Sequence, residues 1–138
     1  MKRKIYALIL TLILLMLTLQ PVAYAEEVTP RYSGVSAVIS TMALEFDCIL
    51  AYTVDVHPLG EGSIDRVHID AELRTVGGRI EKTYDEDLPY EAGMFSFEKR
   101  RAVSVEGVYF LRYTVKCYKN GKLIDTITKS TVTASYPA

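Results

Sequence analysis

The chain has 138 residues, of which 17 are acidic and 16 basic, and its formal net charge is −1. Lys2, Arg3 and Lys4 precede every acidic residue, so residues 26–138 hold 17 acidic and 13 basic side chains and carry a formal charge of −4. This mild acidity argues against a nucleic-acid binder, which should present a basic face. The 113 residues from position 26 onward suffice for one domain and are too few for two.

The N-terminus has the pattern of an export signal. The basic residues Lys2–Lys4 precede the uncharged run Ile5–Leu19, and Ala23–Ala25 supplies small residues on both sides of a tyrosine, as before a cleavage site. The run is shorter than the roughly 20 apolar residues that a membrane-spanning helix needs. We therefore predict a cleavable signal peptide over residues 1–25 and a secreted product with no stable membrane anchor. The alternative is a product tethered to the membrane by an uncleaved signal.

Residues 26–33 are predicted to form a flexible leader, and residues 34–138 a single all-β domain. Apolar and polar side chains alternate with period 2 through this part, whereas a helical period of 3.6 is not sustained. The predicted strands, in chain order, are Val35–Thr41, Leu44–Val56, Arg66–Arg74, Arg79–Tyr84, Met94–Arg101, Val108–Tyr118 and Lys122–Thr133.

Turn-forming residues separate these strands. His57–Gly62 contains one proline and two glycines, Gly77-Gly78 suits a hairpin, and Asn120-Gly121 favours the type I′ turn that matches strand twist. Seven short strands without intervening helices predict an antiparallel β-sandwich. A small closed barrel is the alternative architecture.

The segment Glu106–Leu111 resembles the acid-x-Gly-x-Tyr-x-Cys stretch that opens strand F of immunoglobulin-like domains, with one intervening residue missing. This resemblance implies an immunoglobulin-like sandwich in which Tyr109 forms a tyrosine corner, its hydroxyl bonding back to the loop before the strand. Leu111 stands where the family usually has a cysteine, and the chain has no tryptophan, so the resemblance does not extend to antibody-type domains. The layout of signal, acidic leader and one small sandwich also resembles uncharacterised secreted proteins of Gram-positive bacteria, which implies no activity.

Cys48 and Cys117 are the two cysteines. Both point into the core on the predicted strand faces, and in an immunoglobulin-like layout their strands would be B and F, which face one another. Because an exported protein meets an oxidising environment, a Cys48–Cys117 disulfide is predicted. The alternative is a pair of buried free thiols. The spacing does not fit a metal site, and neither a metal nor another cofactor is predicted.

The two histidines are predicted to be ordinary surface residues. His57 lies in a turn, and His68 points outward from its strand among charged residues. Neither has a nucleophile motif nearby, and the chain lacks Gly-x-Ser-x-Gly and phosphate-loop patterns. We therefore predict that the protein is not an enzyme. A small hydrolase would require one of these histidines beside a buried carboxylate and a serine.

Three further features are predicted to lie at the surface. Asp85–Asp87 is predicted to be a solvated acidic loop, because it lacks the spacing of a calcium-binding loop. Lys99–Arg101 distributes its charges over both faces of a strand and is predicted to protect a sheet edge. Tyr84 and Tyr90 flank the acidic loop and form a candidate binding surface.

Together these features favour a secreted, non-enzymatic binding or cell-surface interaction module. Its partner would be an unknown protein or a component of the cell envelope, and nucleic acid is not expected. The alternative is a carbohydrate-binding module for the cell envelope or extracellular glycans.

Overall fold

Nine β-strands make up the part of the chain that the computed structural model describes, residues 32–138, which forms one compact unit. The predicted signal peptide and residues 26–31 of the predicted leader lie outside the described residues. The strands are β1 Val35–Glu45, β2 Ile49–Pro58, β3 Arg66–Thr75, β4 Ile80–Asp87, β5 Tyr90–Glu91, β6 Met94–Ala102, β7 Gly107–Lys119, β8 Lys122–Ser130 and β9 Ala134–Tyr136. Among these residues there is no helix long and apolar enough to cross a membrane.

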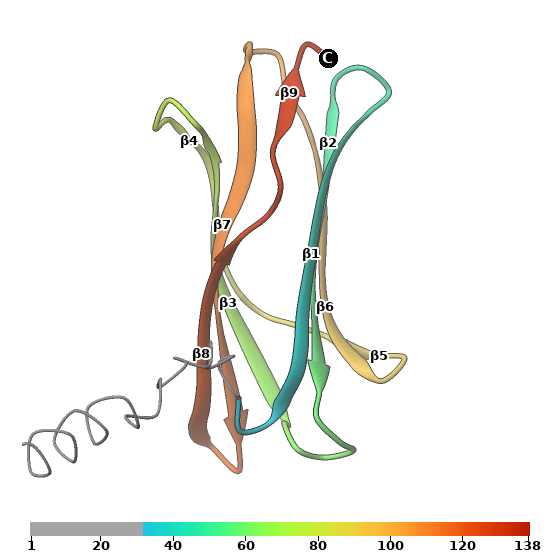
Figure 1. The fold of residues 1–138 in the computed structure, drawn as a ribbon, viewed down its shortest axis with the longest axis vertical. Coiled ribbons are helices and arrows are strands. Elements are labelled where there is room, and N and C mark those ends of the chain that lie inside the picture. The colour runs from blue at the N-terminus through green and yellow to red at the C-terminus, as the bar shows by residue number, and fades with distance from the viewer. Residues whose placement is uncertain (1–31) are drawn as a thin grey trace, which may run out of the picture. The chain divides into compact units, whose positions relative to one another are not determined.

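The strands form two antiparallel sheets that face one another (Figure 1). The first sheet has the order β1-β2-β6-β5, and the second has the order β4-β3-β7-β8, with β9 pairing to β7. In the immunoglobulin nomenclature, these orders correspond to strands A-B-E-D in the first sheet and C′-C-F-G in the second. The fold is therefore an immunoglobulin-like β-sandwich in which β4 is an additional strand, C′, beside strand C. The predicted fold class is confirmed, and the alternative closed barrel is not formed.

Alternating burial explains why these segments became strands of a sandwich. On β3, Val67, Ile69, Ala71 and Leu73 are buried, while the residues between them reach solvent. The hairpin between β7 and β8 turns at Asn120-Gly121, where both residues have positive φ (51° and 75°), as a type I′ turn requires. The predicted turn therefore lies where the sequence placed it.

One predicted strand is wrong as a continuous element. The alternation from Leu44 to Val56 is interrupted by a turn at Phe46–Cys48, so that β1 continues to Glu45 and β2 begins at Ile49. Phe46 and Asp47 take positive φ values of 50° and 65°, and the Cys48 amide donates to the carbonyl oxygen of Phe46 at 2.8 Å. In the sequence, the apolar residues Phe46 and Cys48 continue the alternation of a half-buried strand, which is why one continuous strand was predicted here. In the structure Phe46 is 81% exposed.

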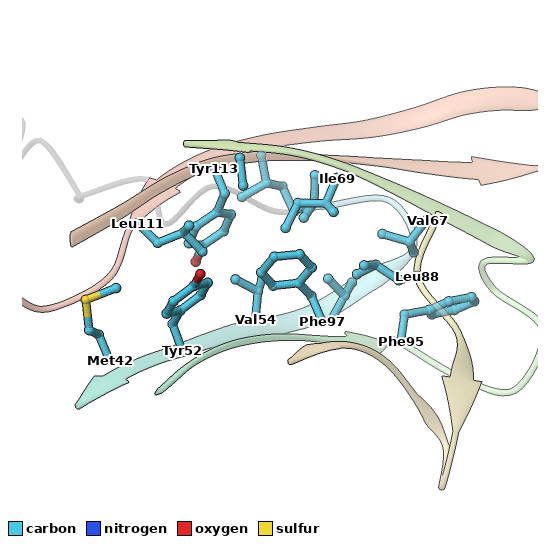
Figure 2. Packing of buried hydrophobic residues seen from close by; sticks show 14 of the residues in the cluster. Met42, Tyr52, Val54, Val67, Ile69, Leu88, Phe95, Phe97, Leu111 and Tyr113 are labelled. Carbon is cyan, nitrogen blue, oxygen red and sulfur yellow. The ribbon is translucent and has the colours of Figure 1, made fainter. Parts of the chain in front are cut away.

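Side chains from both sheets fill the space between them (Figure 2). Tyr52 from β2 and Tyr113 from β7 point toward one another across this core, with Val54 and Phe97 beside them (Figure 2). The largest fully buried side chains are Tyr52, Tyr109, Tyr113, Phe97, Leu50, Ile69, Leu73, Leu111, Val54, Val56, Val67 and Val115. Burying apolar area of this kind is the main favourable contribution to folding, at roughly 25 cal/mol per Å².

Candidate functional site

The predicted disulfide between Cys48 and Cys117 is not formed, and both cysteines are free. Cys48 is exposed in the turn before β2, where the following residue Ile49 pairs with Ala102. Cys117 is buried near the far end of β7, beside Val67 at the start of β3. The two thiols therefore lie at opposite ends of the sandwich, beyond the span of about 7 Å between Cα atoms that a disulfide tolerates.

The error follows from the turn at Phe46–Cys48, which removes Cys48 from the buried strand face on which it had been placed. Cys117 does point into the core, as predicted. Burial raises the pKa of its thiol to about 12, with a smaller contribution from Asp125. Cys117 is therefore an unreactive, packed thiol.

Tyr109 has the geometry of a tyrosine corner. Its ring is fully buried at the start of β7, and its hydroxyl donates to the carbonyl oxygen of Val105 in the preceding loop. The same hydroxyl accepts a hydrogen bond of 3.0 Å from the guanidinium of Arg79. One buried phenol thus ties the loop before β7 to the strand itself.

Replacing Tyr109 with phenylalanine is expected to lower the free energy of unfolding by about 1–2 kcal/mol, because the Val105 carbonyl loses its donor while the ring stays packed. Urea unfolding followed by circular dichroism measures this loss. Tyr118→Phe is the matched control in β7, because Arg66 stacks over the Tyr118 ring at 4.3 Å and phenylalanine keeps that ring. An equal loss in both variants would contradict the role of the corner.

Tyr84 and Tyr90 do not form the shared exposed surface that was predicted. The Tyr84 hydroxyl is hydrogen-bonded to that of the buried Tyr52, and its ring packs edge-on against Phe97, 5.2 Å between centroids. Tyr90 lies in the other sheet, is 55% exposed and packs against Phe95. Tyr90 lines a hollow of about 250 Å³ together with Glu61 and Asp65, whereas the half-buried Tyr84 lines a different hollow, on the second sheet.

The Lys99–Arg101 segment lies in β6, whose partner β5 pairs only with Met94 and Phe95. The basic residues therefore occupy the part of β6 that β5 leaves uncovered. Lys99 crosses to the edge of the second sheet, where its ammonium lies 2.9 Å from the carboxylate of Glu86. This position fits the predicted protection of a sheet edge.

The outer face of the second sheet is polar and hollowed. Its outward side chains form rows across β4, β3, β7 and β8, because residues opposite one another in an antiparallel pair share a face. Two neighbouring rows are Asp85, Asp70, Thr114, Thr128 and Thr83, Glu72, Arg112, Ser130. A hollow of about 610 Å³ lies over these rows, and its lining includes three carboxylates and two guanidiniums, those of Asp70, Glu72, Asp85, Arg74 and Arg112.

At one end of this face, His68 lies among three aspartates. Its Nδ1 is 2.8 Å from Asp87 Oδ1, and its Nε2 is 2.6 Å from Asp85 Oδ1 and 3.6 Å from Asp70 Oδ1. Arg66 Nε lies 3.4 Å from the same Asp87 oxygen, and Lys116 Nζ lies 3.6 Å from Asp70 Oδ2. The His68 side chain is 22% exposed.

The charges of this cluster shift its titration. The hydrogen bond with Asp87 raises the pKa of His68, with smaller contributions from Asp85 and Asp70, and partial burial opposes this shift. In the same way, the hydrogen bond from His68 lowers the pKa of Asp87. The cluster therefore favours a positive charge at the imidazole. The carboxylates of this cluster can hold a cation. Among the described residues, the side-chain partners of His68 are these aspartates, and none is a hydroxyl or thiol nucleophile.

Sequence reasoning missed this cluster because it placed Asp85–Asp87 in a loop. The structure extends β4 to Asp87, so Asp85 and Asp87 are strand residues on the outer face beside His68. In the sequence, Tyr84 and Glu86 alternate with these aspartates, and from this alternation a strand reaching Asp87 could have been predicted. His57 is at the end of β2, where its carbonyl accepts a hydrogen bond from Ser36, and it takes no part in the cluster.

Comparisons with known proteins add little to this description. No protein-family model and no curated protein sequence matches the chain. Among solved structures, the chain is similar to a CARDB domain from Pyrococcus furiosus, whose crystal structure is in complex with di-metal ions. The identity is 13% and the TM-score 0.37, over 77% of this chain and 95% of that one. A likeness of this degree extends no property of that domain to this chain.

Proposed function

We propose that the protein is an exported, non-catalytic β-sandwich module that binds a protein or another component of the cell envelope. The signal-like residues 1–25 support export. The surroundings of His68 support a non-catalytic role, because its partners are exposed carboxylates and not the nucleophile and buried acid of a hydrolytic set.

The observation that carries the proposal is the hollowed outer face of the second sheet. Carboxylates and guanidiniums line it together, with Arg74 Nη1 3.3 Å from Glu72 Oε2 and Arg112 exposed in the neighbouring strand. Small-molecule pockets are mostly apolar and enclosed, whereas a surface of mixed charge offers complementary pairing to a macromolecule. The side chains come from strands of one sheet, so the surface is held rigidly without a partner.

A second candidate is a carbohydrate-binding module, which one specific observation favours. The ring of Tyr90 is exposed beside the carboxylates of Glu61 and Asp65, and an aromatic face next to polar acceptors suits a sugar ring. This surface belongs to the region of β5 and the loop after β2, and it is separate from the outer face of the second sheet.

A binding experiment with two variants distinguishes the candidates. The immobilised protein is titrated with cell-surface protein extract and, separately, with purified cell-wall glycan. The interaction module predicts saturable binding from the protein extract that falls at least tenfold in Arg112→Glu and persists in Tyr90→Ala. The carbohydrate module predicts glycan binding with the opposite response of the two variants. Absence of saturable binding in both titrations would contradict both candidates.

A further inference from the structure

The pairing of β3 with β4 sets two carboxylates against each other. Asp70 lies directly opposite Asp85, and His68 lies directly opposite Asp87 in the next outward pair. Like charges directly opposite in an antiparallel pair destabilise the sheet. Arg66 and Lys116 offset two of the three negative charges, but neither contacts Asp85 in the described residues. The His68 imidazole lies between Asp70 and Asp85, and it can offset their repulsion either as a protonated imidazolium or, after losing the Nε2 proton, as a ligand to a metal ion bound there.

Three donor atoms converge on that position. His68 Nε2 and one carboxylate oxygen each from Asp70 and Asp85 all lie within 4.8 Å of one another. Ligands at about 2.0–2.2 Å from a tetrahedral metal ion are roughly 3.3–3.6 Å apart. The 3.6 Å from Nε2 to Asp70 Oδ1 already fits this spacing. The 2.6 Å contact with Asp85 must open, and Asp85 is free to turn because its side chain is 77% exposed.

The other contacts of the cluster leave these donor atoms available. Asp87 Oδ1 is 2.8 Å from His68 Nδ1, and a carboxylate at this nitrogen holds the proton there, so that a metal ion would take the place of the proton on Nε2. Lys116 lies near Oδ2 of Asp70, so that Oδ1 remains on the side of the imidazole. Arg66 Nε in turn lies 3.4 Å from the same oxygen of Asp87.

We propose that His68, Asp70 and Asp85 bind a divalent transition-metal ion on the outer face of the second sheet, with Asp87 as a positioning residue. One imidazole and two carboxylates suit zinc, cobalt, manganese or nickel better than calcium, which prefers oxygen ligands alone. The remaining coordination positions face solvent. The site stands independently of the proposed binding function, since its ligands come from this chain alone.

Cobalt(II) and zinc(II) titrations of the purified, chelator-treated protein test the site. We expect one equivalent of Co²⁺ to bind and to give a visible absorption band, which Zn²⁺ then displaces. His68→Gln and Asp85→Asn should each weaken binding at least tenfold. Asp87→Asn should weaken it by about 10- to 100-fold, because loss of an orienting carboxylate has effects of this size.

Glu72→Gln is the matched control, because Glu72 lies on the same face of β3, two residues from Asp70, and outside the donor set. This variant should bind Co²⁺ as the unaltered protein does. Circular dichroism confirms that each variant is folded, and Asp85→Asn keeps the test valid if His68→Gln does not fold. The proposal is overturned if the unaltered protein binds no Co²⁺ at millimolar concentration, or if its affinity survives both His68→Gln and Asp85→Asn.

Discussion

Replacing Leu111 with alanine is expected to lower the free energy of unfolding by about 2–5 kcal/mol, the range for truncating a buried leucine. Leu111 is fully buried near the centre of β7, between Tyr109 and Tyr113 on the same face of the strand. The substitution removes its apolar contacts and leaves a cavity that the two flanking tyrosines, fixed by packing, cannot fill. Since domains of this size are stable by only about 5–15 kcal/mol, the loss is a large share of the total. Urea unfolding followed by circular dichroism measures it.

Arg112→Ala is the control for this prediction. Arg112 is the next residue of β7, and it points outward into the hollow of the second sheet. Its truncation should change the free energy of unfolding by less than about 0.5 kcal/mol, as is usual for surface substitutions. If Leu111→Ala were as mild as Arg112→Ala, the assigned strand faces of β7 would be wrong.

Such strand faces are the part of the structure that the sequence predicts well. Burial alternates strictly along Val67–Leu73 and Tyr109–Cys117, because each strand buries one side in the sandwich and exposes the other. The Asn120-Gly121 turn then fixes the pairing of β7 with β8 locally. Fold class follows from such local patterns, and it was predicted correctly.

Turns without glycine are harder to predict from a single sequence. At Phe46–Cys48 the left-handed conformation falls on Phe46 and Asp47, and a phenylalanine rarely adopts it. The apolar period therefore continued through the turn and assigned Cys48 to the core. The erroneous disulfide followed from this one misplaced residue.

The His68 cluster depends on a detail that no local pattern contains. The pairing of β3 with β4 shifts by one residue between Leu73, opposite Lys82, and Arg74, opposite Ile80. Without this bulge, the pairing that begins with Arg74 opposite Ile80 would continue so that Glu86, and not Asp87, lay opposite His68. A slip of one residue exchanges the two faces of a strand, so the bulge is what brings the aspartates to the imidazole.

A second large effect is expected for Asp125→Ala, which should lower the free energy of unfolding by about 2–4 kcal/mol. Asp125 is buried in β8, and its two carboxylate oxygens accept hydrogen bonds from the backbone amides of Ser33 at 2.8 Å and Gly34 at 2.9 Å. Hydrogen bonds to a charged acceptor are among the stronger ones, and alanine leaves both amides without it. Thermal and urea unfolding measure the loss.

The effect should be large because this carboxylate fixes the entry of the chain into β1. Gly34 packs so closely that a Cβ atom on it would lie 2.7 Å from the Ile124 side chain, and its carbonyl accepts from the Leu59 amide at 2.8 Å. Freeing the two amides therefore loosens the start of β1 and the loop after β2 together. Asp65→Ala is the matched control, since Asp65 accepts one backbone hydrogen bond, from Asn120, at an exposed position, and its loss should cost under about 1 kcal/mol. Equal losses in the two variants would show that the anchoring of β1 does not depend on Asp125.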